Sequence, residues 1–150
     1  YQSDDLLKVV DAMKNIMFLC TGNSCRSQMA EGFCRKYWGR ELNVYSAGTK
    51  KHGMNGRATK VMEEVGVALS AQYSKTTAEL PPVAFDYVIT VCDSAKESCP
   101  YFHGSKIVHV GFQDPPALTE HMNDEEAILT IYRRVRDEIE EVIRNLKDYL

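Results

Sequence analysis

The chain has 150 residues, of which 44% are hydrophobic and 26% charged, and its formal net charge is −3. This length and balance are typical of one folded domain, and the slight acidity argues against a nucleic-acid or anionic-membrane partner. Because the sequence contains neither a membrane-spanning apolar run nor a signal-peptide pattern, we expect a cytoplasmic protein.

Residues 1–12 precede the first clear element and carry no functional motif. Ser3 could cap a short helix that places Leu6, Leu7 and Val10 on one side. We interpret this segment as an N-terminal extension, a cloning remnant or the end of a larger chain. The single domain is placed at residues 13–150.

An apolar run over residues 15–19 predicts a central parallel strand, and the loop after it predicts an anion site. Five residues separate Cys20 from Arg26, and a helical pattern follows at once. Such a loop can curl with its backbone N–H groups directed inward at a helix N-terminus, which attracts tetrahedral oxyanions. The residues expected to bind the oxyanion are Thr21, Gly22, Asn23, Ser24, Cys25 and Arg26.

Cys20 lies at the floor of this loop and is the candidate nucleophile. The guanidinium of Arg26 can hold two oxygens in a bidentate fork, and its positive field favours the Cys20 thiolate. Ser27 can donate a hydrogen bond to the sulfur. Cys25 could form a protective disulfide with Cys20 or simply fill space. The alternative, an inert buried cysteine beside a turn, has no use for an Arg-Ser pair at a helix start.

Further strands and helices alternate along the chain, which predicts an α/β fold with a parallel sheet. Further strands are expected at residues 43–46, 86–91 and 107–110. Helices are expected from the loop to Gly39, from about Asn55 to Glu64 and from Asn123 to Leu150, with a short turn near Thr77 to Leu80 and a capping box of Asn123 and Glu126. Ligands of such sheets bind outside the carboxyl ends of the strands, where the Cys20 loop lies.

Asp114 has the context of a general acid. It follows an apolar strand, and two prolines stiffen the loop after it. When a thiolate attacks an oxyanion, the expelled oxygen needs a proton, which a carboxylic acid can supply. The alternative is an aspartate that only caps the Pro-Pro turn.

Cys92 and Cys99 have six residues between them, which is too wide for a zinc knuckle and wrong for Cys-x-x-Cys. If the intervening segment is helical the two sulfurs cannot bond, whereas they can meet if it unwinds, as in a redox relay. A zinc site made by Cys92, Cys99, His103 and His109 is an alternative whose spacing matches no familiar pattern. His52 and His121 are interpreted as surface residues, and Cys34 as a packing residue near the core. The basic cluster of the last helix is interpreted as a solvated face rather than a binding patch; it consists of Arg133, Arg134 and Arg136.

Taken together, six motifs resemble the thioredoxin-coupled bacterial arsenate reductases. They are Cys-Thr-Gly-Asn-Ser-Cys-Arg-Ser-Gln-Met-Ala-Glu-Gly-Phe from Cys20, Ser-Ala-Gly-Thr from Ser46, Val-Ile-Thr-Val-Cys from Val88, Cys-Pro at Cys99, Asp-Pro at Asp114 and Arg-Val-Arg-Asp-Glu-Ile from Arg134. The resemblance covers residues 13–150. It implies the fold of the low-molecular-weight protein tyrosine phosphatases, with a four-stranded parallel sheet of order 2-1-3-4 flanked by helices.

The resemblance also implies a mechanism. Cys20 attacks arsenate while Arg26 binds the arsenate oxygens, and Asp114 protonates the departing oxygen. The same loop can instead hold phosphate or sulfate as an analogue of arsenate. Cys92 then attacks the Cys20–arsenic adduct and releases arsenite, and Cys99 attacks Cys92 in turn. Thioredoxin, or alternatively glutaredoxin with glutathione, reduces the exposed Cys92–Cys99 bond. We expect a monomer with no cofactor and no bound metal.

One departure from the family concerns a cation. Several relatives bind potassium beside the loop through an asparagine and a glutamate, matched here by Asn23 and Glu31, and through an aspartate whose position holds Lys75. We hypothesise that no potassium binds here and that the Lys75 ammonium replaces its charge.

Two rival functions use the same residues. A low-molecular-weight phosphatase acting on phosphotyrosine would share the loop, but those enzymes place tyrosines after the Asp-Pro, where this chain has Pro116, Ala117 and Leu118. They also have no need of a relay between Cys92 and Cys99, although they carry a second cysteine at the position of Cys25. A redox sensor or arsenite-binding protein would keep the cysteines, but it would have no use for Arg26 and Asp114 together.

Overall fold

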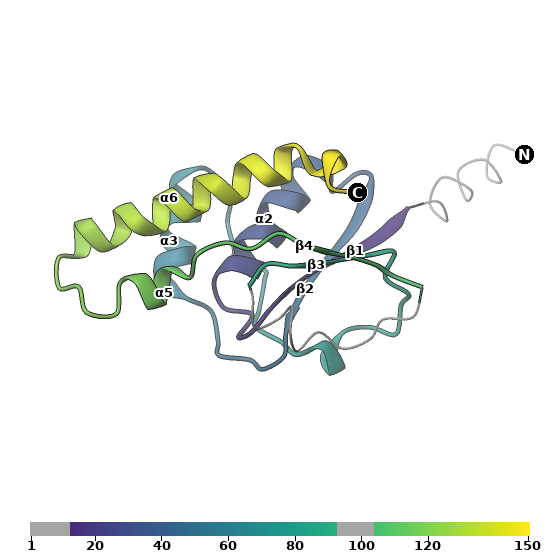
Figure 1. The fold of residues 1–150 in the computed structure, drawn as a ribbon, viewed down its shortest axis with the longest axis horizontal. Helices are drawn as coiled ribbons and strands as arrows, with labels where there is room; N and C mark the ends of the chain where they lie inside the picture. Colours follow the sequence, from purple (N-terminus) through teal and green to yellow (C-terminus); the bar gives the residue numbers. More distant parts are fainter. Residues whose placement is uncertain (1–12, 93–103) are drawn as a thin grey trace, which may run out of the picture.

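The computed structural model describes residues 13–92 and 104–150, which are built around one parallel sheet (Figure 1). Its strands are β1 (Lys14–Cys20), β2 (Leu42–Gly48), β3 (Tyr87–Thr90) and β4 (Lys106–His109). All neighbouring strands pair in parallel, in the order β2-β1-β3-β4. The α/β class and the strand order are therefore confirmed.

The helices of the described residues are α2 (Arg26–Trp38), α3 (Gly56–Glu64), α5 (Pro115–Leu118) and α6 (Glu125–Arg144), with 3₁₀ turns η1 (Thr77–Glu79) and η2 (Leu146–Asp148). In Figure 1, α2, α3 and α6 lie on one side of the sheet, and the segment that contains η1 lies on the other. Within these ranges, none of the helices is both long enough and apolar enough to cross a bilayer.

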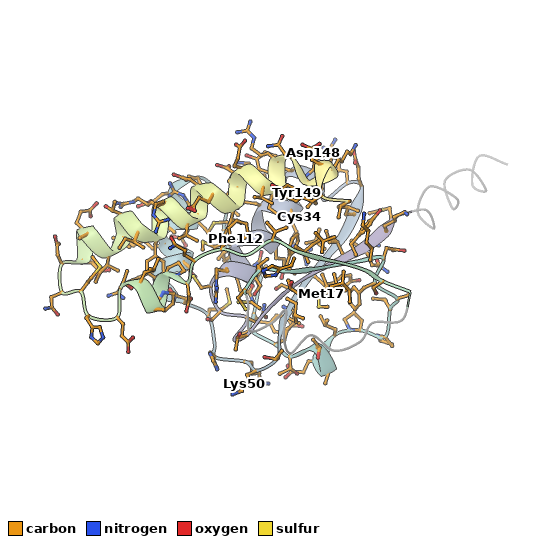
Figure 2. All side chains as sticks on the ribbon, in the orientation of Figure 1. Met17, Cys34, Lys50, Phe112, Asp148 and Tyr149 are labelled. Atoms are coloured by element: carbon orange, nitrogen blue, oxygen red, sulfur yellow. The ribbon has the colours of Figure 1, made fainter. Side chains whose placement is uncertain are left out.

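The central strand β1 is the best buried part of the sheet. Its residues from Ile16 to Cys20 are all buried, and Figure 2 shows Met17 in the interior of the molecule. Each such apolar side chain stabilises the fold by about 1.5–3 kcal/mol. Because β1 ends at Cys20 and α2 begins at Arg26, this packing fixes both ends of the loop between them.

Both ends of α6 differ from the prediction. The N-cap is Asp124 rather than Asn123, because Asp124 has an extended backbone and its Oδ1 accepts a hydrogen bond from the Glu126 amide at 3.2 Å. At the other end the helix stops at Arg144, and the chain continues into η2 instead of remaining helical to Leu150.

The prediction that Arg136 lies on a solvated face of α6 is wrong. The residue is 8% exposed, and its Nη1 donates to the Val61 carbonyl and to Glu64 Oε1, both at 2.9 Å. A buried guanidinium needs such partners because its charge is costly to remove from water. Arg136 therefore joins α6 to α3.

Candidate active site

The loop over residues 21–25 lies at the carboxyl end of the central strand and leads directly into α2. Asn23 has a φ of +49°, a left-handed conformation that asparagine adopts more readily than most residues. Asn23 and Gly22 are buried, and Thr21 and Ser24 are half-buried. The backbone therefore turns tightly within the body of the protein, as an anion-binding nest requires.

A segment after β2, residues 49–55, runs alongside this loop, and we call it the strap. Four backbone hydrogen bonds of 2.9–3.2 Å join the amides of Thr49, Lys50, His52 and Asn55 to the carbonyls of Cys20, Thr21, Gly22 and Ser24. Because the C=O and N–H of a planar trans peptide point in opposite directions, the following N–H groups face away from the strap. Figure 2 shows Lys50 on the strap at the margin of the molecule.

The strap approaches the loop so closely that position 48 cannot carry a side chain. A Cβ on Gly48 would lie 2.3 Å from the Lys50 carbonyl oxygen, 2.6 Å from that of Thr21 and 2.9 Å from the Asn23 nitrogen. All three atoms belong to the backbone, so no side-chain rotation relieves the clash.

We therefore predict that Gly48→Ala destabilises the protein by about 1–3 kcal/mol and weakens phosphate binding, because the strap must move away from the loop. Urea unfolding and calorimetric titration with phosphate measure the two effects. Gly56→Ala is the matched control, since a Cβ there meets no atom within 4 Å. A Gly48→Ala protein with unchanged stability and affinity would contradict the prediction.

The Asn23 side chain fastens the loop from below. Its Nδ2 donates to Ser27 Oγ at 2.9 Å and to Ser46 Oγ at 3.0 Å. Its Oδ1 accepts from Gln28 Nε2 at 2.9 Å and from the Lys75 amide at 3.0 Å. All the hydrogen-bonding capacity of this buried amide is therefore used to hold the loop on α2, β2 and the segment before η1.

Ser27 does not occupy the predicted place beside the nucleophile. It is fully buried, and within the described residues its hydrogen-bond partner is Asn23 rather than the Cys20 sulfur. The residue lies on the first turn of α2, and the prediction missed that the Asn23 amide reaches under the loop to the same hydroxyl. Ser27 is thus placed to support the loop from below.

Cys20 and Cys92 are brought together at the floor of the loop. Leu19 of β1 pairs with Thr90 of β3, so the next residues of both strands emerge at the same edge of the sheet. Both cysteines are buried, and the Cys92 Sγ lies 3.3 Å from Thr21 Oγ1. Cys99 belongs to residues 93–103 and lies outside the described residues.

The environment of Cys20 changes the pKa of its thiol. The neighbouring Cys92 thiol and then burial raise the pKa of Cys20, whereas the Arg26 guanidinium lowers it by a smaller amount. Arg26 therefore favours the Cys20 thiolate, as expected, but Cys92 and burial together have the larger, opposite effect on the pKa. The expectation missed that a second thiol would share the same buried space.

Arg26 keeps one nitrogen free for a ligand. Its Nη1 donates to the Phe112 carbonyl at 3.0 Å, and its Nη2 lies 3.5 Å from Asp114 Oδ1. The Nε is buried and, among the described residues, has no hydrogen-bond partner. Leaving such a donor unsatisfied costs about 1–3 kcal/mol, so the site gains free energy when an oxyanion accepts from it.

Asp114 lies beside Arg26 of the anion loop. The ion pair with Arg26 brings it there, and 39% of its side chain is exposed. It occupies the N-cap position of α5, but its side chain makes no capping hydrogen bond. Its carboxyl group is therefore not engaged by the Pro115–Pro116 turn, contrary to the alternative interpretation.

Two further cysteines have environments that suppress reactivity. Burial, the largest cause in both cases, raises the pKa of Cys25 and of Cys34 to about 12. Asp114 also raises the pKa of Cys25, and Arg26 lowers it. Both residues are free thiols here, and Cys34 packs in the core (Figure 2).

Lys75 lies next to the carboxylate that matches the family's cation site. It is 6% exposed, its Nζ lies 3.8 Å from Glu31 Oε1, and it donates to the Tyr73 carbonyl at 2.9 Å. Burial lowers the pKa of Lys75, and Glu31 opposes that change. The residues present do not fit a potassium ion, because an ammonium group already lies beside the carboxylate.

We predict that replacing Na⁺ by K⁺ at constant ionic strength leaves the melting temperature and kcat/KM of the wild type unchanged. The Lys75→Asp variant should instead become more stable and more active in K⁺, because its carboxylate restores an oxygen ligand. Thermal denaturation and turnover in the two salts provide the test. A potassium-dependent gain in the wild type would count against the role of Lys75.

The described residues contain no cluster of three or more histidine, cysteine, aspartate or glutamate side chains able to hold a metal ion. His109 Nδ1 lies 2.8 Å from Thr90 Oγ1. The zinc alternative also needs Cys99 and His103, which lie outside the described residues.

Sequence reasoning missed the part played by His52. The residue is exposed, as predicted, but it belongs to the strap, and its ring lies against Gly22 of the loop. No periodicity or motif in the Lys-Lys-His-Gly run signals this contact, which depends on the path of the chain after β2.

Comparison with known proteins identifies the family. Residues 15–150 match the family described as low molecular weight phosphotyrosine protein phosphatase. An arsenate reductase of Halalkalibacterium halodurans is 46% identical over 136 residues, which are 90% of this chain and 96% of that protein. An arsenate reductase in the phosphate binding state has a TM-score of 0.76 at 30% identity, over 92% of this chain and 100% of that one. An arsenate reductase in an oxidized state has a TM-score of 0.72 at 30% identity, over 89% of this chain and 96% of that one. The chain therefore belongs to the low molecular weight phosphotyrosine protein phosphatase family and, within it, to the arsenate reductases.

Proposed function

We propose that this chain reduces arsenate to arsenite through successive disulfides, first between Cys20 and Cys92 and then between Cys92 and Cys99. The observation that carries the proposal is that Cys20 and Cys92 are both buried at the floor of one anion loop, with Cys92 Sγ 3.3 Å from Thr21 Oγ1 of that loop. A phosphatase needs one nucleophilic sulfur, whereas a reductase needs a second sulfur within reach of the first. The similarity to arsenate reductases supports the same activity.

In the first step the loop amides and Arg26 hold the arsenate, and the Cys20 sulfur attacks arsenic. A sulfur–arsenic bond forms and an arsenic–oxygen bond breaks, and the oxygen leaves as water with a proton from Asp114. Cys20 must lose its own proton before it attacks. Because its pKa is raised in the free protein, we assign that proton to the incoming arsenate dianion.

In the second step the Cys92 sulfur attacks the Cys20 sulfur of the adduct. A disulfide forms, the sulfur–arsenic bond breaks, and its electron pair stays on arsenic, which leaves as arsenite. Thr21 Oγ1, 3.3 Å from Cys92 Sγ, is placed to stabilise the attacking thiolate. Cys99 then displaces Cys20 from Cys92, and a thioredoxin dithiol reduces the resulting Cys92–Cys99 bond.

The relay predicts that Cys99→Ser completes about one turnover and then stops, because its Cys20–Cys92 bond cannot be passed on. The assay follows arsenate-dependent NADPH oxidation with thioredoxin and thioredoxin reductase, and parallel reactions contain glutaredoxin, glutathione and glutathione reductase. Multiple turnover by Cys99→Ser would refute the relay. Faster turnover with glutaredoxin would replace thioredoxin as the partner.

Phosphatase activity is the second candidate, favoured by the family match and by the Cys20–Arg26–Asp114 arrangement. The α5 residues after Asp114 are Pro115–Leu118 and offer no tyrosine to hold an aromatic substrate. Cys92→Ser separates the two functions, since it removes reduction and leaves phosphatase chemistry intact. Hydrolysis of p-nitrophenyl phosphate without any arsenate reduction by the wild type would favour the phosphatase.

A further inference from the structure

The absence of a side chain at Gly22 is not explained by its φ angle. Among the described glycines, those with a positive φ are Gly53, Gly66 and Gly104, and Gly22 is not one of them. The φ of Gly22 therefore does not by itself require glycine. The space around Gly22 must explain why it has none.

The His52 imidazole occupies that space. A Cβ built on Gly22 would lie 2.4 Å from Nδ1, 2.8 Å from Cγ and 3.2 Å from Cβ of His52, and these are its three nearest neighbours. The contrast with Gly48 is informative, because there the conflicting atoms belong to the backbone. At Gly22 the conflict is with one exposed side chain, so removing that side chain should relieve it.

The same two residues are also joined through the backbone. The His52 amide donates to the Gly22 carbonyl at 3.0 Å, and Ser74 Oγ donates to the same oxygen at 3.1 Å. These bonds direct the carbonyl outward, so the N–H of the Gly22–Asn23 peptide is directed toward the inside of the loop. The imidazole above Gly22 hinders rotation of this peptide away from that orientation.

We propose that His52 is a positioning residue of the anion loop, which packs on Gly22 and holds the Gly22–Asn23 N–H toward the bound oxyanion. The identity of the oxyanion, arsenate, rests on the proposed function. Phosphate binding tests the positioning by itself, because it requires the loop and no redox step.

A double-mutant cycle on Gly22→Ala and His52→Ala tests the packing. The readouts are the phosphate Kd from calorimetry and the KM and kcat for arsenate. We expect Gly22→Ala to weaken phosphate binding about tenfold in the wild type but less than about threefold in the His52→Ala background. Two matched controls are Gly56→Ala, which should change nothing, and His121→Ala, which should not rescue Gly22→Ala.

A conservative variant separates packing from charge. His52→Ala should raise the phosphate Kd and the arsenate KM about threefold with kcat nearly unchanged, because a few van der Waals contacts are lost. His52→Phe keeps a planar ring over Gly22 and should restore both values. If Gly22→Ala does not fold, the comparison of His52→Ala with His52→Phe still tests the proposal.

Additive effects in the cycle, or a Phe variant as weak as the Ala variant, would overturn the role of His52. A change in melting temperature with no change in Kd would also overturn it, since that result indicates a merely structural residue. Failure of the proposed function is distinguishable, because the wild type would then bind phosphate but reduce no arsenate.

Discussion

Replacing Cys20 by serine should lower arsenate reduction by at least about 10⁴-fold while leaving phosphate affinity within about threefold of the wild type. The hydroxyl cannot form the sulfur–arsenic bond or the later disulfide, so both steps at this position are lost. The loop itself is held by the strap and by the Asn23 side chain, neither of which uses the Cys20 sulfur. Turnover with thioredoxin and calorimetric phosphate titration measure the two quantities.

Cys34→Ala is the control for this experiment. Cys34 is a buried core thiol whose pKa is raised to about 12, and we assign it no chemistry, so the variant should keep its activity. Residual reduction above about 1% in Cys20→Ser would show that another sulfur attacks arsenic. Loss of phosphate binding together with activity would show that Cys20 shapes the loop.

Changing Arg26 to lysine should reduce kcat/KM for arsenate about 10²- to 10³-fold, although the charge is kept. The guanidinium uses Nη1 for the Phe112 carbonyl and Nη2 for Asp114, which leaves Nε for the oxyanion. A single ammonium nitrogen cannot reach all three acceptors from one position. Steady-state kinetics and phosphate titration of the variant provide the measurement, and we expect the phosphate Kd to rise as well.

The matched control is Arg134→Lys on α6, because Arg134 is exposed and its ion pair with Glu138 is confined to the helix surface. Exposed pairs of this kind contribute about 0–1 kcal/mol, so that variant should resemble the wild type. Near-normal kcat/KM in Arg26→Lys would mean that the unpartnered Nε does not bind the substrate.

The parts of the site that depend on local pattern could be predicted from the sequence. The strand, the five-residue loop and the following helix are contiguous, so Cys20 and Arg26 could be placed from spacing alone. Asp114 was predicted because it follows an apolar strand, and parallel strands bring their carboxyl ends to one edge. The resemblance, rather than the pattern, supplied the strand order and the pairing of Cys20 with Cys92.

The parts that depend on long-range packing could not be predicted. No spacing rule indicates that the strap supplies amides to the loop carbonyls or that His52 covers Gly22. The partner of Ser27 and the raised pKa of Cys20 likewise follow from which side chains share a buried space. The helical pattern likewise predicts that Arg136 is exposed, whereas in the structure it is buried because α3 lies against it.

The unsatisfied Nε of Arg26 also bears on how the protein distinguishes two nearly identical oxyanions. The Nε donor can form a hydrogen bond with any tetrahedral oxyanion, so it favours the binding of phosphate and arsenate alike. Abundant cellular phosphate therefore competes with arsenate for the loop. Under the proposed mechanism, discrimination falls to the electron-transfer step, since arsenic(V) accepts two electrons from thiols and phosphorus(V) does not. Phosphate then acts as a reversible competitor that slows arsenate reduction without consuming reducing equivalents.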